Sequence, residues 1–133
     1  MLNQDNNLYV AHSDKPLYIC ADKANRHGVI AGATGTGKTV SLQVLAESFS
    51  ELGVPVFMAD MKGDLSGIYK SGILNKFIAK RQTEFGVEFN FQSYPARFFD
   101  VYAEQGHPLR ATISDMGPLL LSRILELNET QTG

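Results

Sequence analysis

A glycine-rich octapeptide, GATGTGKT at residues 32–39, constrains this chain more than any other feature of its sequence. Glycine has no Cβ, so its backbone can adopt positive φ and lets other groups approach closely. Three glycines within six positions therefore predict a loop whose backbone N–H groups point inward, an arrangement that binds anions. The lysine and threonine that come next supply a positive charge and a hydroxyl suited to Mg²⁺. The spacing is that of the phosphate-binding G-x-x-x-x-G-K-[ST] loop.

The residues around this loop predict the strand, loop and helix that such a motif requires. HGVIAG predicts a short buried strand at about 27–31, and KTVSLQVLAESFSEL predicts a helix at about 37–52. GVPVFMAD, bounded by Gly53 and Asp60, predicts a second buried strand at about 54–59, of the kind found in parallel sheets. Together these elements make one βαβ unit, whose crossover is expected to be right-handed.

The candidate site residues are inferred from this arrangement. Lys38 is expected to contact the β- and γ-phosphates of ATP, and Thr39 is expected to hold the metal ion, Mg²⁺. Asp60 ends the second predicted strand, where ligands bind in open α/β sheets, and with Lys38 it is a predicted catalytic residue. The alternative interpretation of Asp60 is an ordinary turn carboxylate. The predicted nucleotide-binding residues are Gly32, Ala33, Thr34, Gly35, Thr36, Gly37, Lys38, Thr39 and Val40.

Three weaker candidates lie just after Asp60 in the chain, namely Lys62, Gly63 and Asp64. Gly63 is equally well explained as a turn residue, and Asp64 as the cap of a helical turn after it. The histidines and the single cysteine, Cys20, lack the spacing of a metal site, so a zinc site is not expected.

Further elements are predicted on both sides of the βαβ unit. Two short strands joined by a Ser-Asp-Lys-Pro turn predict an N-terminal β-hairpin. A second helix is predicted from apolar residues at helical spacing, and a third is expected to begin at Ser114 or Asp115 with Pro118 in its first turn. The expected ranges are 8–12 and 17–20 for the hairpin, 73–85 for the second helix, and 96–102 for a later strand, with short strands also possible in EFNFQS and LRATIS.

Composition limits the class of protein. The chain has 133 residues, enough for one ordinary core, with 44% hydrophobic and 20% charged residues, as in globular proteins. A net charge of −2 gives no support for nucleic-acid binding. One cysteine excludes an internal disulfide, and no run of about 18 apolar residues or basic leader predicts membrane insertion or export. We therefore expect a cytoplasmic protein without membrane partners.

Two long stretches resemble the beginning of a bacterial HerA-like helicase family of P-loop ATPases, within the HerA/FtsK group. The first runs from NRHGVIAG to DMKGDLSG, and the second is GHPLRATISDMGPLLLSRILELNETQ. Many families share the phosphate loop, whereas DMKGDLSG and MGPLLLSRILELNETQ are much more specific to this one. The resemblance covers nearly the whole chain.

The resemblance implies an α/β fold, the P-loop NTPase (RecA-like) parallel-sheet core, here incomplete and preceded by the short β-hairpin. Residues 1–133 would form the N-terminal part of one P-loop ATPase domain, with N-terminal strands in 1–26 and a partial nucleotide-binding core in 27–133. It also implies ATP and Mg²⁺ as cofactors, a homo-oligomer that is often a hexameric ring, DNA translocation in the better-known relatives, and a nuclease partner.

The chain departs from the family pattern downstream of residue 60. No apolar strand ending in Asp-Glu supplies a metal-organising carboxylate and a general base, and no arginine finger can be assigned among Arg97, Arg110 and Arg123. Family members are several times longer, so we expect an N-terminal fragment that is inactive alone. Two alternatives stay open: a small P-loop phosphotransferase, which would need an arginine-rich lid, and a non-catalytic nucleotide-binding module.

Overall fold

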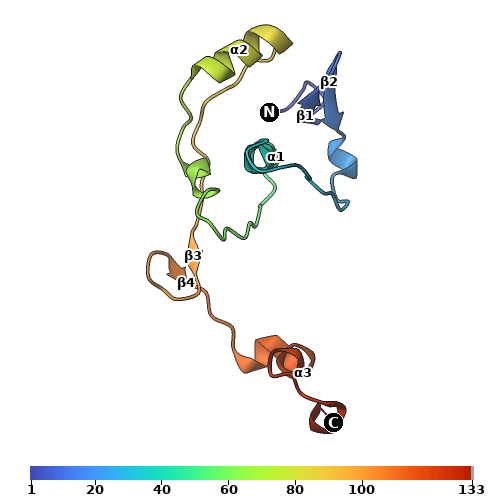
Figure 1. The fold of residues 1–133 in the computed structure, drawn as a ribbon, viewed down its shortest axis with the longest axis vertical. Helices are drawn as coiled ribbons and strands as arrows, with labels where there is room; N and C mark the ends of the chain where they lie inside the picture. Colours follow the sequence, from blue (N-terminus) through green and yellow to red (C-terminus); the bar gives the residue numbers. More distant parts are fainter. Residues whose placement is uncertain (133) are drawn as a thin grey trace. The chain divides into compact units, whose positions relative to one another are not determined.

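The computed structural model describes residues 1–132 of a mixed α/β chain (Figure 1). The chain divides into two compact units, Met1–Ala96 and Arg97–Gly133, which are described separately. The first unit contains β1 (Leu8–His12), β2 (Pro16–Ile19), the 3₁₀ turn η1 (Ala21–Lys23), α1 (Lys38–Glu51), the 3₁₀ turn η2 (Ser66–Tyr69) and α2 (Lys76–Phe85). The second contains β3 (Phe99–Asp100), β4 (His107–Pro108), α3 (Ile113–Ile124) and α4 (Glu129–Thr132).

The predicted N-terminal hairpin is confirmed to within one residue at each end. Strands β1 and β2 pair antiparallel, with Leu8 opposite Ile19 and a register shift between Tyr9 and Ala11. The Leu8 side chain is fully buried. The rings of Tyr9 and Tyr18, opposite each other in the ladder, meet edge to face with their centroids 5.9 Å apart. Cross-strand aromatic pairs of this kind stabilise a hairpin register.

Helix α1 is also confirmed, because the predicted range of 37–52 differs from the observed one by a single residue at each end. Glycines in the left-handed backbone region bound it, with φ of 95° at Gly37 and 77° at Gly53. β1 packs against this helix. The buried residues of α1, Ala46 and Ser48, are small. Small side chains allow another segment to approach the helix backbone closely.

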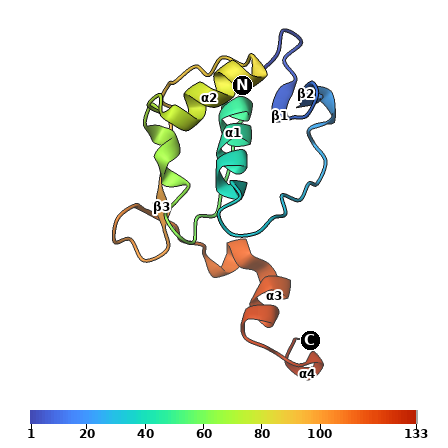
Figure 2. The ribbon, with the colours of Figure 1, turned by 45° about the horizontal axis from the view of Figure 1, so that its top comes forward.

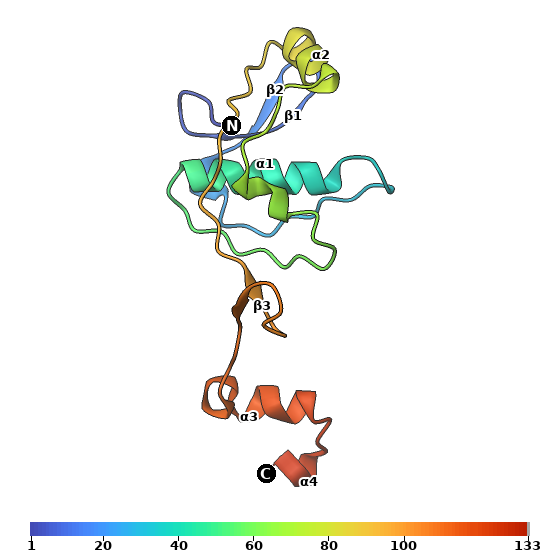
Figure 3. The ribbon, with the colours of Figure 1, turned by 90° about the vertical axis from the view of Figure 1, so that its left-hand side faces the viewer.

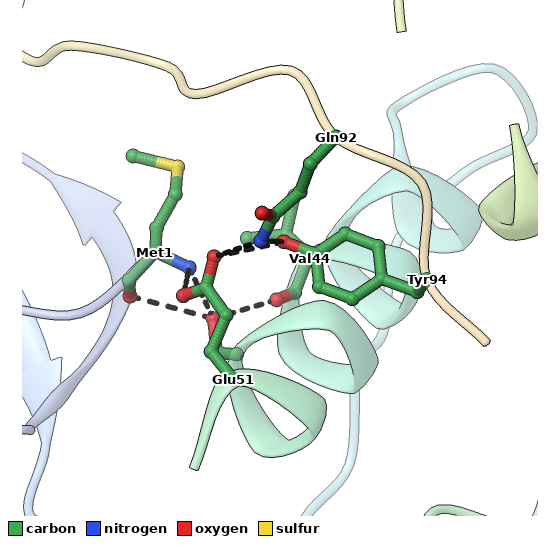
Figure 4. Close-up of polar contacts among 6 residues, drawn as sticks. Met1, Val44, Glu51, Gln92 and Tyr94 are labelled. Carbon is green, nitrogen blue, oxygen red and sulfur yellow. Dashed lines mark hydrogen bonds and ion pairs between the residues drawn. The ribbon is translucent and has the colours of Figure 1, made fainter. Parts of the chain in front are cut away.

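The C-terminal half of α1 is tied to both ends of the first unit by polar contacts (Figure 4). The α-amino group of Met1 donates to Ser48 Oγ at 2.8 Å and pairs with Glu51 at 3.0 Å. The other Glu51 oxygen accepts from Tyr94 Oη at 2.8 Å and from Gln92 Nε2 at 3.1 Å. Burial of the phenol, together with the adjacent Glu51 carboxylate, raises the pKa of Tyr94 to about 12.

The predicted buried strands at 27–31 and 54–59 are wrong for this structure. Both segments, one before and one after α1 in the chain, run as irregular chain (Figures 2 and 3), and Val29 and Phe57 are 91% and 81% exposed. A strand needs a hydrogen-bonding neighbour, and within residues 1–132 no other strand lies alongside either segment. The parallel-sheet core is therefore not formed by the described residues.

Helix α2 begins three residues later than predicted. The Asn75 side chain caps it, accepting a hydrogen bond from Ile78 N at 2.9 Å, and Gly86 ends it with φ of 61°. Because an Asn cap satisfies an otherwise unpaired N–H, the helix starts at the cap rather than at the first apolar residue. The His12 ring stacks on Phe85 at a centroid distance of 4.5 Å, which brings the end of α2 against the hairpin.

In the second unit, the strand predicted at 96–102 shrinks to the two residues of β3, which pairs in parallel with β4. The Asp100 carboxylate accepts hydrogen bonds from the backbone N–H groups of Tyr102, Glu104 and Gln105, and these contacts turn the chain away from an extended path. The short strands considered in EFNFQS and LRATIS do not form in the described residues.

Helix α3 starts differently from the prediction. Thr112, rather than Ser114 or Asp115, is the N-cap, and Asp115 completes a reciprocal capping box with it. Gly117, with φ of 67° and ψ of 168°, interrupts the helix, and Pro118 comes directly after the break. Proline lacks the N–H that a continuous helix would need, so it belongs at the start of the next helical segment. None of the helices in the described part of the chain has the length and apolar character to cross a membrane.

Candidate phosphate-binding site

The glycine-rich loop closes around one carbonyl group, that of Ala33. Thr36 donates to this oxygen from its backbone N at 3.4 Å and from its hydroxyl at 2.8 Å. Lys38 Nζ donates to the same oxygen at 2.7 Å. Gly35 and Gly37 have φ of 80° and 95°, values at which a Cβ would be strained. The loop predicted from the sequence thus forms as a tight turn leading into α1.

Glycine is required at position 32 because the Thr36 side chain lies close to its Cα, and not because its φ is positive. A Cβ at this position would lie 2.7 Å from the Thr36 hydroxyl oxygen and 3.8 Å from Lys38 Cγ. A side chain there would displace the Thr36 hydroxyl from its hydrogen bond to Ala33. The first glycine therefore allows the Thr36 hydroxyl to pack against the loop backbone and reach the Ala33 carbonyl.

The N-terminus of α1 lies beside this loop and carries no acidic residue of its own. Gly37 is the N-cap and makes no side-chain cap, and the first turn contains no acidic residue. The first N–H groups of a helix have no acceptor within the helix, and the helix dipole places partial positive charge there. Within residues 1–132, no carboxylate lies within ion-pair distance of Lys38. An anion would therefore meet the first backbone N–H groups of α1 and an ammonium group that is bonded to a carbonyl oxygen rather than to a carboxylate.

The structure brings Asp64 into contact with the first turns of α1, where the loop ends. Thr39 Oγ1 donates to Asp64 Oδ2 at 3.3 Å, and Gln43 Nε2 donates to the Asp64 carbonyl oxygen at 3.0 Å. The segment after residue 60 thus lies beside the start of α1 (Figure 3). The sequence offered Asp64 as a weaker site candidate, equally well explained as a cap for a helical turn, and η2 has no side-chain cap. A contact across 25 residues has no signature in local spacing.

Asp60 organises its own loop. Its carboxylate accepts hydrogen bonds from Gly63 N at 2.8 Å, Leu65 N at 3.0 Å and Lys62 N at 3.2 Å. Partial desolvation raises the pKa of this carboxyl, but the backbone N–H groups together outweigh it and hold the pKa below its ordinary value. The turn-carboxylate interpretation accounts for these contacts, and a catalytic role for Asp60 stays a prediction.

The remaining predicted residues lie on the exposed side of the site. Ala33 and Thr34 are exposed, and the Val40 side chain on the first turn of α1 is 60% exposed. No group of three histidine, cysteine or carboxylate side chains is arranged to hold a metal ion among the described residues. Mg²⁺ in nucleotide sites is held by few protein ligands and by phosphate oxygens. The Thr39 hydroxyl oxygen is the ligand that this site would offer to the ion.

Comparison with known families decides the affiliation. The family described as helicase HerA-like C-terminal matches residues 5–133. The chain belongs to this family. The resemblance to the HerA-like family is thereby confirmed, and family membership points to an ATPase of the HerA-like kind. No curated protein and no solved structure matches the chain.

Proposed function

We propose that this chain is the nucleotide-binding segment of a HerA-like motor ATPase, with Mg-ATP bound on residues 32–40 and its hydrolysis coupled to DNA translocation in the full-length protein. The observation that carries the proposal is the loop itself. A turn built on left-handed glycines leads into an uncapped helix N-terminus, with an ammonium group unpaired by any carboxylate of residues 1–132. Family membership supplies the reaction class.

Each loop residue has a separate task in this proposal. The backbone N–H groups at the start of α1 take phosphate oxygens, and Lys38 moves its ammonium group from the Ala33 carbonyl to the β- and γ-phosphates. Giving up the hydrogen bond to Ala33 costs about 1.5–3 kcal/mol, which charge-assisted bonds to phosphate offset. Since catalysis of phosphoryl transfer is mainly positioning and charge stabilisation, Lys38 acts more strongly in the transition state than in binding.

The residues present fit a magnesium nucleotide. Gly32 has no Cβ that would displace the Thr36 hydroxyl from the loop, and the Thr39 hydroxyl lies in the first turn of α1, where it donates to the Asp64 carboxylate. Bound Mg²⁺ would neutralise phosphate charge in this position. Asp60 would contribute by holding the loop at 60–65 in shape or, as the sequence predicts, by facing the nucleotide directly.

The segments 27–31 and 54–59 would each pair with neighbouring strands in the full-length protein. Both are apolar, and their exposed Val29 and Phe57 are the residues that a parallel sheet would cover. We place them in a RecA-like sheet whose further strands come from the longer protein. The general base, the arginine finger and the ring of subunits would also come from outside this segment, as would the DNA and nuclease contacts, which the net charge of −2 does not favour here.

The proposal is tested by DNA-stimulated ATP hydrolysis in the full-length protein, comparing Lys38→Ala with Lys80→Ala. Lys80 lies exposed on α2 and controls for the removal of one positive charge. Lys38→Ala is expected to lower turnover by at least about 100-fold, as loss of one transition-state donor does, while Lys80→Ala keeps the wild-type rate. Wild-type turnover in Lys38→Ala contradicts the proposal. ATP binding without turnover in the parent protein favours the non-catalytic module, and turnover indifferent to DNA removes the translocase assignment.

A further inference from the structure

The contact between Thr39 and Asp64 joins two segments that the chain separates by 25 residues. It is reinforced from a second direction, because Gln43, one turn further along α1, donates to the Asp64 carbonyl oxygen at 3.0 Å. Gln43 therefore holds the main chain of Asp64 at the first turns of α1, and Thr39 contacts its carboxylate there. Asp60 fixes the path of the same loop by accepting three backbone N–H groups.

The chemistry of a hydroxyl explains what this contact can do. A threonine hydroxyl carries one proton and two lone pairs, and its O–H bond rotates freely unless an acceptor holds it. When Thr39 donates its hydroxyl proton to the Asp64 carboxylate, the lone pairs of the Thr39 oxygen point away from Asp64 and are available to a cation. A carboxylate behind a metal ligand also increases the basicity of the ligand oxygen.

We propose that Asp64 is a positioning residue for magnesium binding, because its carboxylate accepts the Thr39 proton and aims the Thr39 oxygen at the cation. The inference rests on the proposed function, since it concerns the Mg²⁺ of the bound nucleotide. It adds to that function a residue outside the phosphate loop, and it assigns to the 60–65 loop the task of delivering a carboxylate to α1. Asp64 itself makes no bond to the cation and acts through Thr39.

The experiment measures ADP binding by the full-length protein as a function of Mg²⁺ concentration, which needs no turnover. The readout is the Mg²⁺ concentration at half of the magnesium-dependent gain in affinity. Asp64→Ala is expected to raise this concentration by about 10- to 100-fold, the loss typical for an outer-shell partner of a metal ligand. Asp64→Asn keeps an acceptor oxygen and is expected to raise the half-effect Mg²⁺ concentration by a smaller factor. Asp22→Asn is the matched control, because Asp22 is exposed and forms an ion pair with Lys23, and it should leave the titration unchanged.

A double variant separates positioning from a merely structural role. In a Thr39→Ala background no hydroxyl remains to be aimed, so adding Asp64→Ala should produce no further shift. Additive shifts would overturn the inference, as would an unchanged titration in Asp64→Ala or equal shifts in Asp64→Ala and Asp64→Asn. Each of these results leaves the proposed function standing, because the parent protein still binds the magnesium nucleotide. A parent protein that binds no ADP at any Mg²⁺ concentration instead overturns the proposed function and this inference together.

Discussion

Replacing Gly37 with alanine tests the link between backbone geometry and phosphate binding. Gly37 has φ of 95° and ψ of 17°, and nothing lies within 4 Å of where its Cβ would be. The substitution therefore introduces backbone strain without a clash. A side chain in left-handed conformation costs about 1–2 kcal/mol per residue, and alanine is also a poorer N-cap than glycine. We expect Gly37→Ala to lower the free energy of unfolding of the first unit by about 1–2 kcal/mol.

Gly28→Ala is the matched control, because Gly28 also has open space around its Cβ position but no positive φ. This variant should be neutral or more stable by about 0.4–1 kcal/mol, since alanine reduces the entropy of the unfolded chain. The assay is urea unfolding followed by helical circular dichroism, with the m-value checked for constancy. Any part of this strain that the empty loop releases should appear instead as weaker nucleotide binding, up to about 5- to 30-fold in Gly37→Ala if all of it is released. Equal stability and affinity in the two variants would refute the reasoning.

Three further predictions concern the packing and pH dependence of the chain. Tyr94 has a pKa of about 12 when folded and about 10 when unfolded, so stability should fall as pH rises from about 10 to 12, and Tyr94→Phe should remove that loss in a pH series of unfolding curves. Leu8→Ala should cost about 2–4 kcal/mol because Leu8 is fully buried, whereas Leu17→Ala, 45% exposed, should cost less than about 1 kcal/mol; equal losses in thermal unfolding would contradict the packing. Thr112→Ala should reduce the helicity of α3 and leave α1 unchanged in residue-resolved chemical shifts, since Thr112 caps only the former.

Local signals in the sequence predicted the elements that are stable on local grounds. The Ser-Asp-Lys-Pro turn between two alternating segments defines the hairpin, and two glycines define the limits of α1. The left-handed backbone at Gly35 and Gly37 was also foreseeable, because the motif concentrates glycine where only glycine fits without strain.

The missed strands and the missed Asp64 contact share one physical cause, which is dependence on partners distant in sequence. The segments 27–31 and 54–59 have the composition of buried strands, but composition cannot supply the neighbour that a strand requires. The contact of Asp64 with Thr39 was missed for the same reason, because the pattern around residue 60 points to Asp60 at the strand end. In α3 the error was local: Thr112 competed successfully with Ser114 and Asp115 because its capping box satisfies two donors.

The central claim is that residues 32–40 bind the phosphates of a nucleotide, and backbone amide chemical shifts test it most directly. At 14.6 kDa the chain suits a titration with Mg-ADP followed in ¹⁵N–¹H correlation spectra. The account predicts that the largest shifts fall on the amides of residues 32–40 and of Asp64, and that Lys38→Ala weakens them without altering the spectrum of the hairpin. Shifts that are absent from residues 32–40, or that persist unchanged in Lys38→Ala, would contradict it.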